Sequence, residues 1–173
     1  MCRVWQVGFG DDADFVMRYL NAYDTPANRI VRRDSEGHIV ALMHYHRFSA
    51  GQADGAYIYG VTTLPQWRGR GLARQMLHEA FEAMSREGIA FAMLIAEEPS
   101  LRQWYATMQF TLLDGITVEV TGSDGMNFGM DDSSLNVPMV RAIANDEAPA
   151  ATPGDYLTSF PKKIIINTSD TRQ

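Results

Sequence analysis

Cysteine is almost absent from this sequence, in which Cys2 is the only cysteine among 173 residues. A single cysteine excludes an intramolecular disulfide and a zinc site built from cysteines, and it fits a reducing compartment. Long apolar runs are absent as well. The most apolar stretch, residues 88–96, is about half as long as a membrane span, and residues 1–12 lack the apolar core of a signal peptide. We therefore predict a cytoplasmic protein that does not bind membranes.

Basic residues are fewer than acidic residues. The 15 Lys and Arg residues are outnumbered by 21 Asp and Glu residues, so the net charge is −6. This surplus repels nucleic acids and anionic membranes, and neither is expected as a partner. An anionic ligand would have to bind at a local basic patch. Hydrophobic residues make up 46% of the chain, which is enough to bury the core of one domain.

The spacing of apolar residues predicts helices and strands over most of the chain. The aspartates at positions 11, 12 and 14 introduce a helical pattern that ends before Pro26, and residues 30–48 predict a hairpin. Residues 56–63 predict a third antiparallel strand, and residues 72–84 form an amphipathic stripe that ends at Gly88. Residues 89–96 predict a buried central strand, reached by a crossover. Residues 100–103 fit a capping box for a short third helix, with Leu101 on its apolar face.

The rest of the chain gives weaker signals. Residues 116–120 and 138–143 are strand candidates that we expect to complete the sheet, and the stretch between them is rich in glycine and aspartate. Pro, Gly and Ala over residues 145–155 indicate a linker. We therefore predict a domain over residues 1–144, followed by a linker and tail over residues 145–173. Residues 164–166 are interpreted as an added edge strand, a contact in a homodimer, or an ordered tail.

A basic, glycine-containing segment separates the third predicted strand from the amphipathic helix. Its sequence over residues 66–73 is QWRGRGLA. Gly69 and Gly71 allow a sharp turn, and the helix that follows offers unpaired N–H groups and the positive end of its dipole. Arg68, Arg70 and Arg74 place three cations within seven residues. This combination suits a pyrophosphate, although the segment matches neither the P-loop nor the dinucleotide-binding fingerprint.

Two motifs resemble those of the GCN5-related N-acetyltransferase (GNAT) family. Gln66-x-x-Gly69-x-Gly71 is similar to its motif A. Leu101-x-x-Trp104-Tyr105-x-x-x-Gln109-Phe110 is similar to its motif B, except that Gln109 stands where the family usually has glycine. The resemblance implies an α/β (α+β) fold with a mixed, largely antiparallel sheet flanked by helices.

The resemblance also implies roles for individual residues. Backbone amides from Arg68 through Gly69, Arg70 and Gly71 to Leu72, after Gln66 of the same motif, would bind the pyrophosphate of coenzyme A. Val61 and Thr63 would pair with the pantetheine arm, and the Val61 N–H would polarise the thioester carbonyl. Tyr105 would protonate the leaving thiolate.

No general base stands out from the sequence. Glu97 and Glu98 follow the central strand, and we favour Glu97. His44, His46, Tyr57 and Tyr59 lie on strands that could face the acceptor. The two histidines come without a nearby carboxylate signal, so no metal is predicted.

These observations favour an acyltransferase that moves an acetyl group from acetyl-CoA to a primary amine, in a small molecule or a protein, by direct attack in a ternary complex. A non-catalytic module that binds or senses coenzyme A or acyl-CoA is the main alternative. Nucleotide phosphate binding is a third. The negative net charge mildly favours a cationic acceptor.

Overall fold

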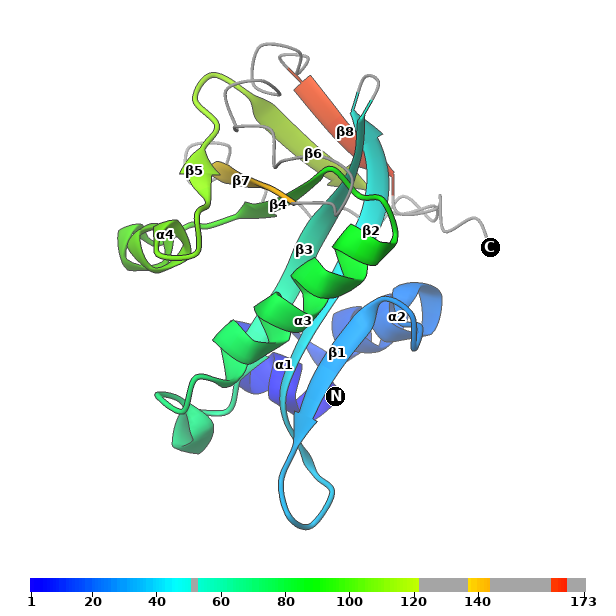
Figure 1. Cartoon of the computed structure of the whole chain (residues 1–173). Coiled ribbons are helices and arrows are strands. Elements are labelled where there is room, and N and C mark those ends of the chain that lie inside the picture. The colour runs from blue at the N-terminus through cyan, green and yellow to red at the C-terminus, as the bar shows by residue number, and fades with distance from the viewer. Residues whose placement is uncertain (51–52, 122–136, 144–162, 168–173) are drawn as a thin grey trace. The chain divides into compact units, whose positions relative to one another are not determined.

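The computed structural model describes residues 1–50, 53–121, 137–143 and 163–167 (Figure 1). Two helices come first, three strands follow, and α3 and α4 then flank β4 before the remaining strands. The elements are α1 (Cys2–Phe9), α2 (Ala13–Tyr23), β1 (Arg29–Arg33), β2 (Ile39–Ala50), β3 (Ala53–Thr63), η1 (Pro65–Trp67), α3 (Leu72–Arg86), β4 (Phe91–Ile95), α4 (Pro99–Ala106), β5 (Thr111–Leu112), β6 (Thr117–Thr121), β7 (Pro138–Ala142) and β8 (Lys163–Asn167).

The main sheet has six strands in the order β1-β2-β3-β4-β7-β5. β1 is antiparallel to β2, and β7 is antiparallel to both β4 and β5. β3 and β4 are parallel, because α3 connects them as a crossover. The predicted mixed, largely antiparallel sheet is therefore confirmed, as are the hairpin, the amphipathic helix and the central strand.

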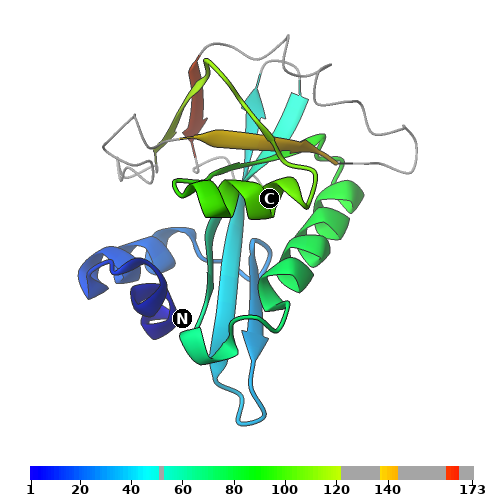
Figure 2. The ribbon, with the colours of Figure 1, turned by 90° about the vertical axis from the view of Figure 1, so that its left-hand side faces the viewer.

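The chain forms two compact units, and β2 and β3 contribute to both. The first unit contains residues 1–45 and 58–83, and the second contains residues 46–57 and 84–173. In the first unit, α1 and α2 lie on one face of the strands and α3 lies on the other (Figure 2). Apolar side chains from these helices and from β1 to β3 make up the buried core of this unit.

Two helices with different start signals cover that first face. The α2 helix begins as predicted, with the Asp12 carboxylate accepting a hydrogen bond of 2.8 Å from the Phe15 N–H. The α1 helix is not predicted from the sequence, because it is short and no side chain caps its first turn. It ends at Gly10, which has a left-handed φ of 79° and donates its N–H to the Gln6 carbonyl at 2.9 Å.

The second unit corrects one prediction about the sheet. The strand candidate at residues 138–143 joins the main sheet as β7, but the candidate at residues 116–120 does not. It forms β6, which pairs in parallel with β8 in a separate two-stranded sheet. Val118 and Val120 of β6 are buried and are paired in register with Ile164 and Ile166 of β8, which are also buried. The short β5 is not predicted either.

The start of α4 also differs from the prediction. Pro99 occupies the first helical position and Glu98 precedes it as the N-cap, with no hydrogen bond from a capping side chain. The capping box predicted at residues 100–103 is therefore wrong, because proline already fixes the backbone angle that starts this helix. The Leu101 side chain is 45% exposed rather than part of the apolar face.

Some predictions concern residues outside the described ranges. These are most of the stretch rich in glycine and aspartate, the linker at residues 145–155, and the boundary between residues 144 and 145. In the described residues, no helix is long and apolar enough to cross a membrane.

Candidate active site

The end of β3 and the turn that follows it form the most distinctive part of the first unit. The ladder between β3 and β4 pairs Gly55, Ala56 and Tyr57 with Phe91, Ala92 and Met93, and β3 continues beyond it to Thr63. Val61 and Thr63 are half-buried at this end of the strand. The backbone then turns through η1, where the Arg68 N–H donates to the Pro65 carbonyl at 3.2 Å. The Arg68 amide, one of those assigned to a pyrophosphate, therefore already has an acceptor.

Two left-handed glycines follow η1. Gly69 and Gly71 both have a φ of 75°. A Cβ atom built on either one would have no neighbour within 4 Å. Glycine is therefore needed here for the backbone conformation and not for lack of space. Because Gly69 and Gly71 alternate with arginines, successive backbone N–H groups can face a common acceptor, which is a known way to bind an anion.

The α3 helix begins directly after Gly71. The Gln75 N–H donates to the Gly71 carbonyl at 3.0 Å, which is the first hydrogen bond of the helical ladder. The N–H groups of Leu72 and Ala73 precede that bond and have no carbonyl one turn back. The first turn carries no acidic residue. The positive end of the helix dipole is therefore not neutralised locally and attracts negative charge.

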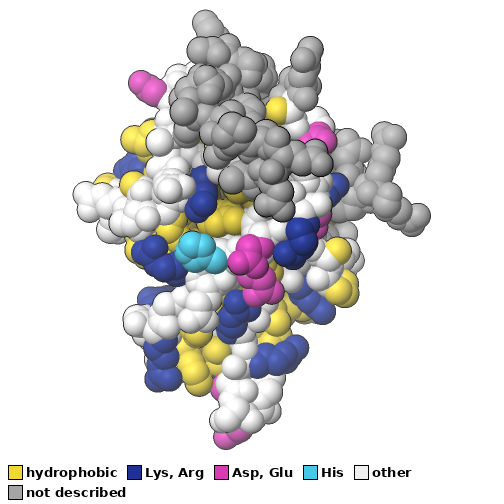
Figure 3. Space-filling model, in the orientation of Figure 1, with side chains coloured by type: hydrophobic (Ala, Val, Ile, Leu, Met, Phe, Trp, Pro, Cys, Tyr) yellow, Lys and Arg dark blue, Asp and Glu magenta, His cyan; other side chains and the backbone are white. Residues whose placement is uncertain are grey.

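Arginine side chains brace this turn. Arg68 Nε donates to the Thr63 carbonyl at 3.1 Å, and Arg70 Nη2 donates to the Gln66 carbonyl at 3.3 Å. The Arg70 guanidinium also lies over the Trp67 ring, 4.5 Å from its centroid. Each guanidinium has five N–H groups, so both remain able to bind an anion. Basic side chains lie over η1 at the lower left of the face shown in Figure 3.

Tyr105 lies in the second unit, on α4. Its side chain is 8% exposed and packs against the rings of Trp104 and Phe110, with centroids 4.9 Å and 5.6 Å away. Burial raises the pKa of the Tyr105 phenol well above its usual value of 10.0. The hydroxyl therefore keeps its proton at neutral pH and above, as a proton donor must.

Glu97 lies in the same unit, immediately after β4, and is exposed to solvent. The residue before it, Ala96, is buried and donates its N–H to the Val137 carbonyl at 3.1 Å. Glu98 is the N-cap residue of α4. The two glutamates therefore lie at the start of the helix that carries Tyr105.

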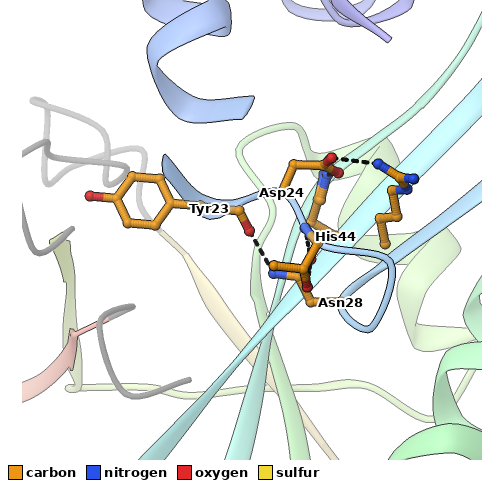
Figure 4. Close-up of polar contacts among 6 residues, drawn as sticks. Tyr23, Asp24, Asn28 and His44 are labelled. Atoms are coloured by element: carbon orange, nitrogen blue, oxygen red, sulfur yellow. Dashed lines mark hydrogen bonds and ion pairs between the residues drawn. The ribbon is translucent and has the colours of Figure 1, made fainter. Parts of the chain in front are cut away.

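The strand histidines are buried in the core. His44 is 0% exposed and His46 is 2% exposed. The Nε2 atom of His44 lies 2.9 Å from Asp24 Oδ1, and Asp24 also forms an ion pair with Arg29 (Figure 4). Asn28 closes this network by donating to the Tyr23 carbonyl at 2.8 Å. The carboxylate partner of His44 is not evident from the sequence, because Asp24 is 20 residues away.

Burial opposes ionisation of Asp24, but its hydrogen bonds and electrostatic interactions with His44 and Arg29 outweigh that effect. The pKa of the Asp24 carboxyl is therefore lowered from its usual 3.8. This network joins the end of α2 to β1 and β2, which is a structural task. Among the described residues, no three His, Cys, Asp or Glu side chains lie close enough together to hold a metal ion.

Tyr57 and Tyr59, the other two strand residues considered as bases, are largely enclosed. Tyr57 is 2% exposed. Burial, and to a smaller extent the negative charge of Asp11, raises the pKa of Tyr59 above its usual value of 10.0. A phenol with a raised pKa is a poor general base. The residues predicted to bind acetyl-CoA, from Val61 to Leu72, all lie in the first unit. Glu97 and Tyr105 belong to the second unit.

Comparison with known proteins identifies the family of this chain. Residues 1–111, which include both motifs, match the family model described as an acetyltransferase (GNAT) domain. A search of the curated proteins found no significant match. Solved structures show a similar fold at low sequence identity.

One is the GNAT family N-acetyltransferase YhbS from Escherichia coli in complex with CoA, with a TM-score of 0.62 and 16% identity over 97% of this chain and 82% of that chain. Another is the ribosomal-protein-S18-alanine N-acetyltransferase from Escherichia coli, with a TM-score of 0.57 and 12% identity over 84% of this chain and 88% of that chain. A third is N-acetylglutamate synthase from Neisseria gonorrhoeae complexed with coenzyme A and N-acetyl-glutamate, with a TM-score of 0.54 and 12% identity over 78% of this chain and 28% of that chain. The family model covers well over half of the sequence, and the chain belongs to the GNAT acetyltransferase family.

Proposed function

We propose that this GNAT-family protein transfers the acetyl group of acetyl-CoA to a primary amine by direct attack, without a covalent enzyme intermediate. The observation that carries the proposal is the turn at Gly69 and Gly71. Two left-handed glycines, arginines on both sides and an unneutralised helix dipole converge there on one short segment. Such a segment suits a pyrophosphate better than a single phosphate, because it offers several N–H groups in succession.

The residues of the first unit fit coenzyme A along its length. The backbone amides from Gly69 to Leu72 would bind the pyrophosphate, with Arg68 and Arg70 adding positive charge. The pantetheine arm would pair with the backbone of Val61 and Thr63 as an added strand, because β3 runs on beyond its ladder with β4.

The proposed chemistry needs a donor to the carbonyl oxygen and two proton transfers. The Val61 N–H would donate to the thioester carbonyl and stabilise the negative charge that develops on its oxygen. The amine nitrogen forms a bond to the carbonyl carbon, and the bond from that carbon to sulfur breaks. Tyr105 would give its proton to the departing sulfur, because a phenol can donate a proton as the bond between carbon and sulfur breaks.

A protonated amine is not nucleophilic, so a base must take up the proton that the amine loses. We assign this role to Glu97, because it is exposed and reachable by an incoming amine. Substituting Glu97 with Gln should shift the pH dependence of the rate to higher pH, where more of the amine is already neutral. An unchanged pH profile would remove Glu97 from the mechanism.

The donor site is tested by calorimetric titration with acetyl-CoA. Gly69→Glu should abolish binding, because the new side chain adds bulk and negative charge where the pyrophosphate is expected. Gly37→Glu is a matched control: Gly37 also has a left-handed φ, of 86°, and no neighbour within 4 Å of a Cβ. It carries the same backbone strain and charge change in the β1–β2 turn and should leave affinity unchanged. No binding to the unmodified protein would refute the proposal.

Catalysis is separated from ligand sensing by Tyr105→Phe, assayed against a panel of primary amines. A catalyst should lose roughly 100-fold or more in kcat while its affinity for acetyl-CoA is retained. A sensing module has no turnover to lose. Full activity of this variant across the pH range would refute the role given to Tyr105.

A further inference from the structure

The α1 helix makes an unusually close approach to β3 at Gly8. A Cβ atom placed on Gly8 would lie 2.0 Å from Thr62 Oγ1 and 2.8 Å from Thr62 Cβ. Glycine inside a helix costs about 1 kcal/mol of stability relative to alanine. Glycine occupies this position nevertheless, because any larger residue would push α1 away from the strand. Figure 2 shows α1 lying against this face of the strands.

A second contact between the same two elements lies at Gly60. This residue has a φ of 66° inside β3, and a Cβ on it would lie 2.8 Å from Cζ3 of the Trp5 ring. The Trp5 side chain is 1% exposed, and its Nε1 donates a hydrogen bond of 2.7 Å to Asp11 Oδ2. The rings of Tyr19 and Tyr59 pack on Trp5 at 4.7 Å and 5.3 Å between centroids. The indole is therefore held firmly against the strand backbone.

The two contacts flank one residue. Gly60 precedes Val61 and Thr62 follows it, so α1 touches β3 on both sides of Val61. The direction of the Val61 N–H is set by the peptide plane between Gly60 and Val61. Any shift of Gly60 against the indole, or of Thr62 against Gly8, therefore rotates that N–H.

We infer that α1 is a positioning element for the Val61 amide, and that Gly8, Trp5 and Asp11 act on the reaction through it without touching the substrate. The inference rests on the proposed function, in which that amide donates to the thioester carbonyl. Donors to a developing oxyanion work only in a narrow range of geometry, and a displacement of about 1 Å can cost 100-fold in rate.

The main test is Gly8→Ala, with Val7→Ala as its matched control. Val7 neighbours Gly8 on α1 but is 46% exposed, so its truncation leaves the packing on β3 intact. Gly8→Ala raises the helix propensity of α1, yet it should lower kcat roughly 10- to 100-fold with little change in the affinity for acetyl-CoA. Adding Thr62→Ala removes the nearest atom and should restore part of the lost rate. Val7→Ala should behave like the unmodified protein.

A second pair of variants addresses the indole. Asp11→Asn keeps an oxygen that can accept from Trp5 Nε1, whereas Asp11→Ala removes it. Asp11→Ala should lower kcat and Asp11→Asn should retain most of it. This pair carries the test if Gly8→Ala does not fold. A structural role alone would lower the melting temperature of these variants without separating kcat from ligand affinity.

The chemical shift of the Val61 amide in the ligand-free protein, measured by 15N NMR, tests the positioning by α1 separately from the proposed function. Gly8→Ala and Asp11→Ala should move this signal, and Val7→Ala should not. If the unmodified protein neither binds nor uses acetyl-CoA, the proposed function fails, while the amide signal still reports on positioning. A Gly8→Ala variant with an unmoved Val61 signal and normal kcat would overturn the inference.

Discussion

Replacing Gln109 with glycine should make the protein more stable. Gln109 has a φ of 66° and is the one residue other than glycine with a positive φ in the described part of the chain. It lies in the turn after α4, where its own N–H donates to the Ala106 carbonyl at 3.0 Å. The left-handed conformation lets the next residue, Phe110, donate its N–H back to the Tyr105 carbonyl at 3.3 Å. The strain is therefore held in place by the packing of this turn.

The magnitude follows from two opposing effects. A residue with a side chain pays about 1–2 kcal/mol in the left-handed region, and glycine does not. Glycine loses more chain entropy on folding, which costs about 0.5–1 kcal/mol. The side chain of Gln109 is exposed, so its removal costs little packing. The net gain is about 0.5–1 kcal/mol, or an increase of about 1 to 4 °C in melting temperature for a chain of this size.

The assay is urea unfolding, with Gln103→Gly as the matched control. Gln103 is also exposed, but it lies inside α4. There the same substitution should lower the free energy of unfolding by about 1 kcal/mol. The same chemical change thus has opposite signs at two positions six residues apart in the sequence. A Gln109→Gly variant that is less stable than the unmodified protein would refute the argument.

Three further predictions concern the ionisation of buried side chains and the turn at Gly69 and Gly71. Burial raises the pKa of both Tyr59 and Tyr105, so the unfolded chain releases these protons first and stability should fall as the pH rises above 10, by up to about 1.4 kcal/mol per pH unit for each phenol. Tyr59→Phe should flatten this alkaline loss in melting experiments, and an unchanged slope would contradict it. The lowered pKa of Asp24 gives stability that is present above pH 3.8 and is lost as the pH falls through the folded-state value. Asp24→Asn should therefore be less stable at pH 7 by about 1.5–3 kcal/mol, and should lose less on acidification than the unmodified protein. Trp67→Ala removes the ring under the Arg70 guanidinium and should weaken acetyl-CoA binding several-fold, whereas Trp67→Phe should retain most of it in the same titration.

The local signals in the sequence predicted most of the fold. Apolar periodicity located α2, α3 and the central strand, and the carboxylate of Asp12 marked the start of α2. These features depend on residues within one or two turns of each other, so the sequence carries them directly. The left-handed conformation at Gln109 has another origin, because only the resemblance to motif B, which usually has glycine at this position, drew attention to the turn.

Two of the failures share a physical cause, because each depended on a partner distant in the sequence. β6 pairs with β8 and not with the main sheet, and this pairing depends on tertiary structure, which strand propensity does not predict. The pairing of His44 with Asp24 likewise appears only after α2 and β2 have come together. Both contacts form only when segments distant in the sequence come together, so local sequence patterns do not predict them.

The glycines show which long-range features could have been found earlier. Gly69 and Gly71 stood out because they lie between predicted elements, where a turn is expected. Gly8 and Gly60 lie inside a helix and a strand, where glycine weakens the element and therefore indicates a close approach or a bulge. Gly8 and Gly60 lie beside Val61 near the end of β3, and Gly69 and Gly71 follow that end. The turn at Gly69 and Gly71 needs glycine for its own conformation, whereas Gly8 and Gly60 allow α1 to approach the backbone beside Val61. The pyrophosphate end and the thioester end of the proposed coenzyme A site therefore depend on different structural features. Substitutions in the turn should therefore change affinity for acetyl-CoA, and substitutions under α1 should change the rate of transfer.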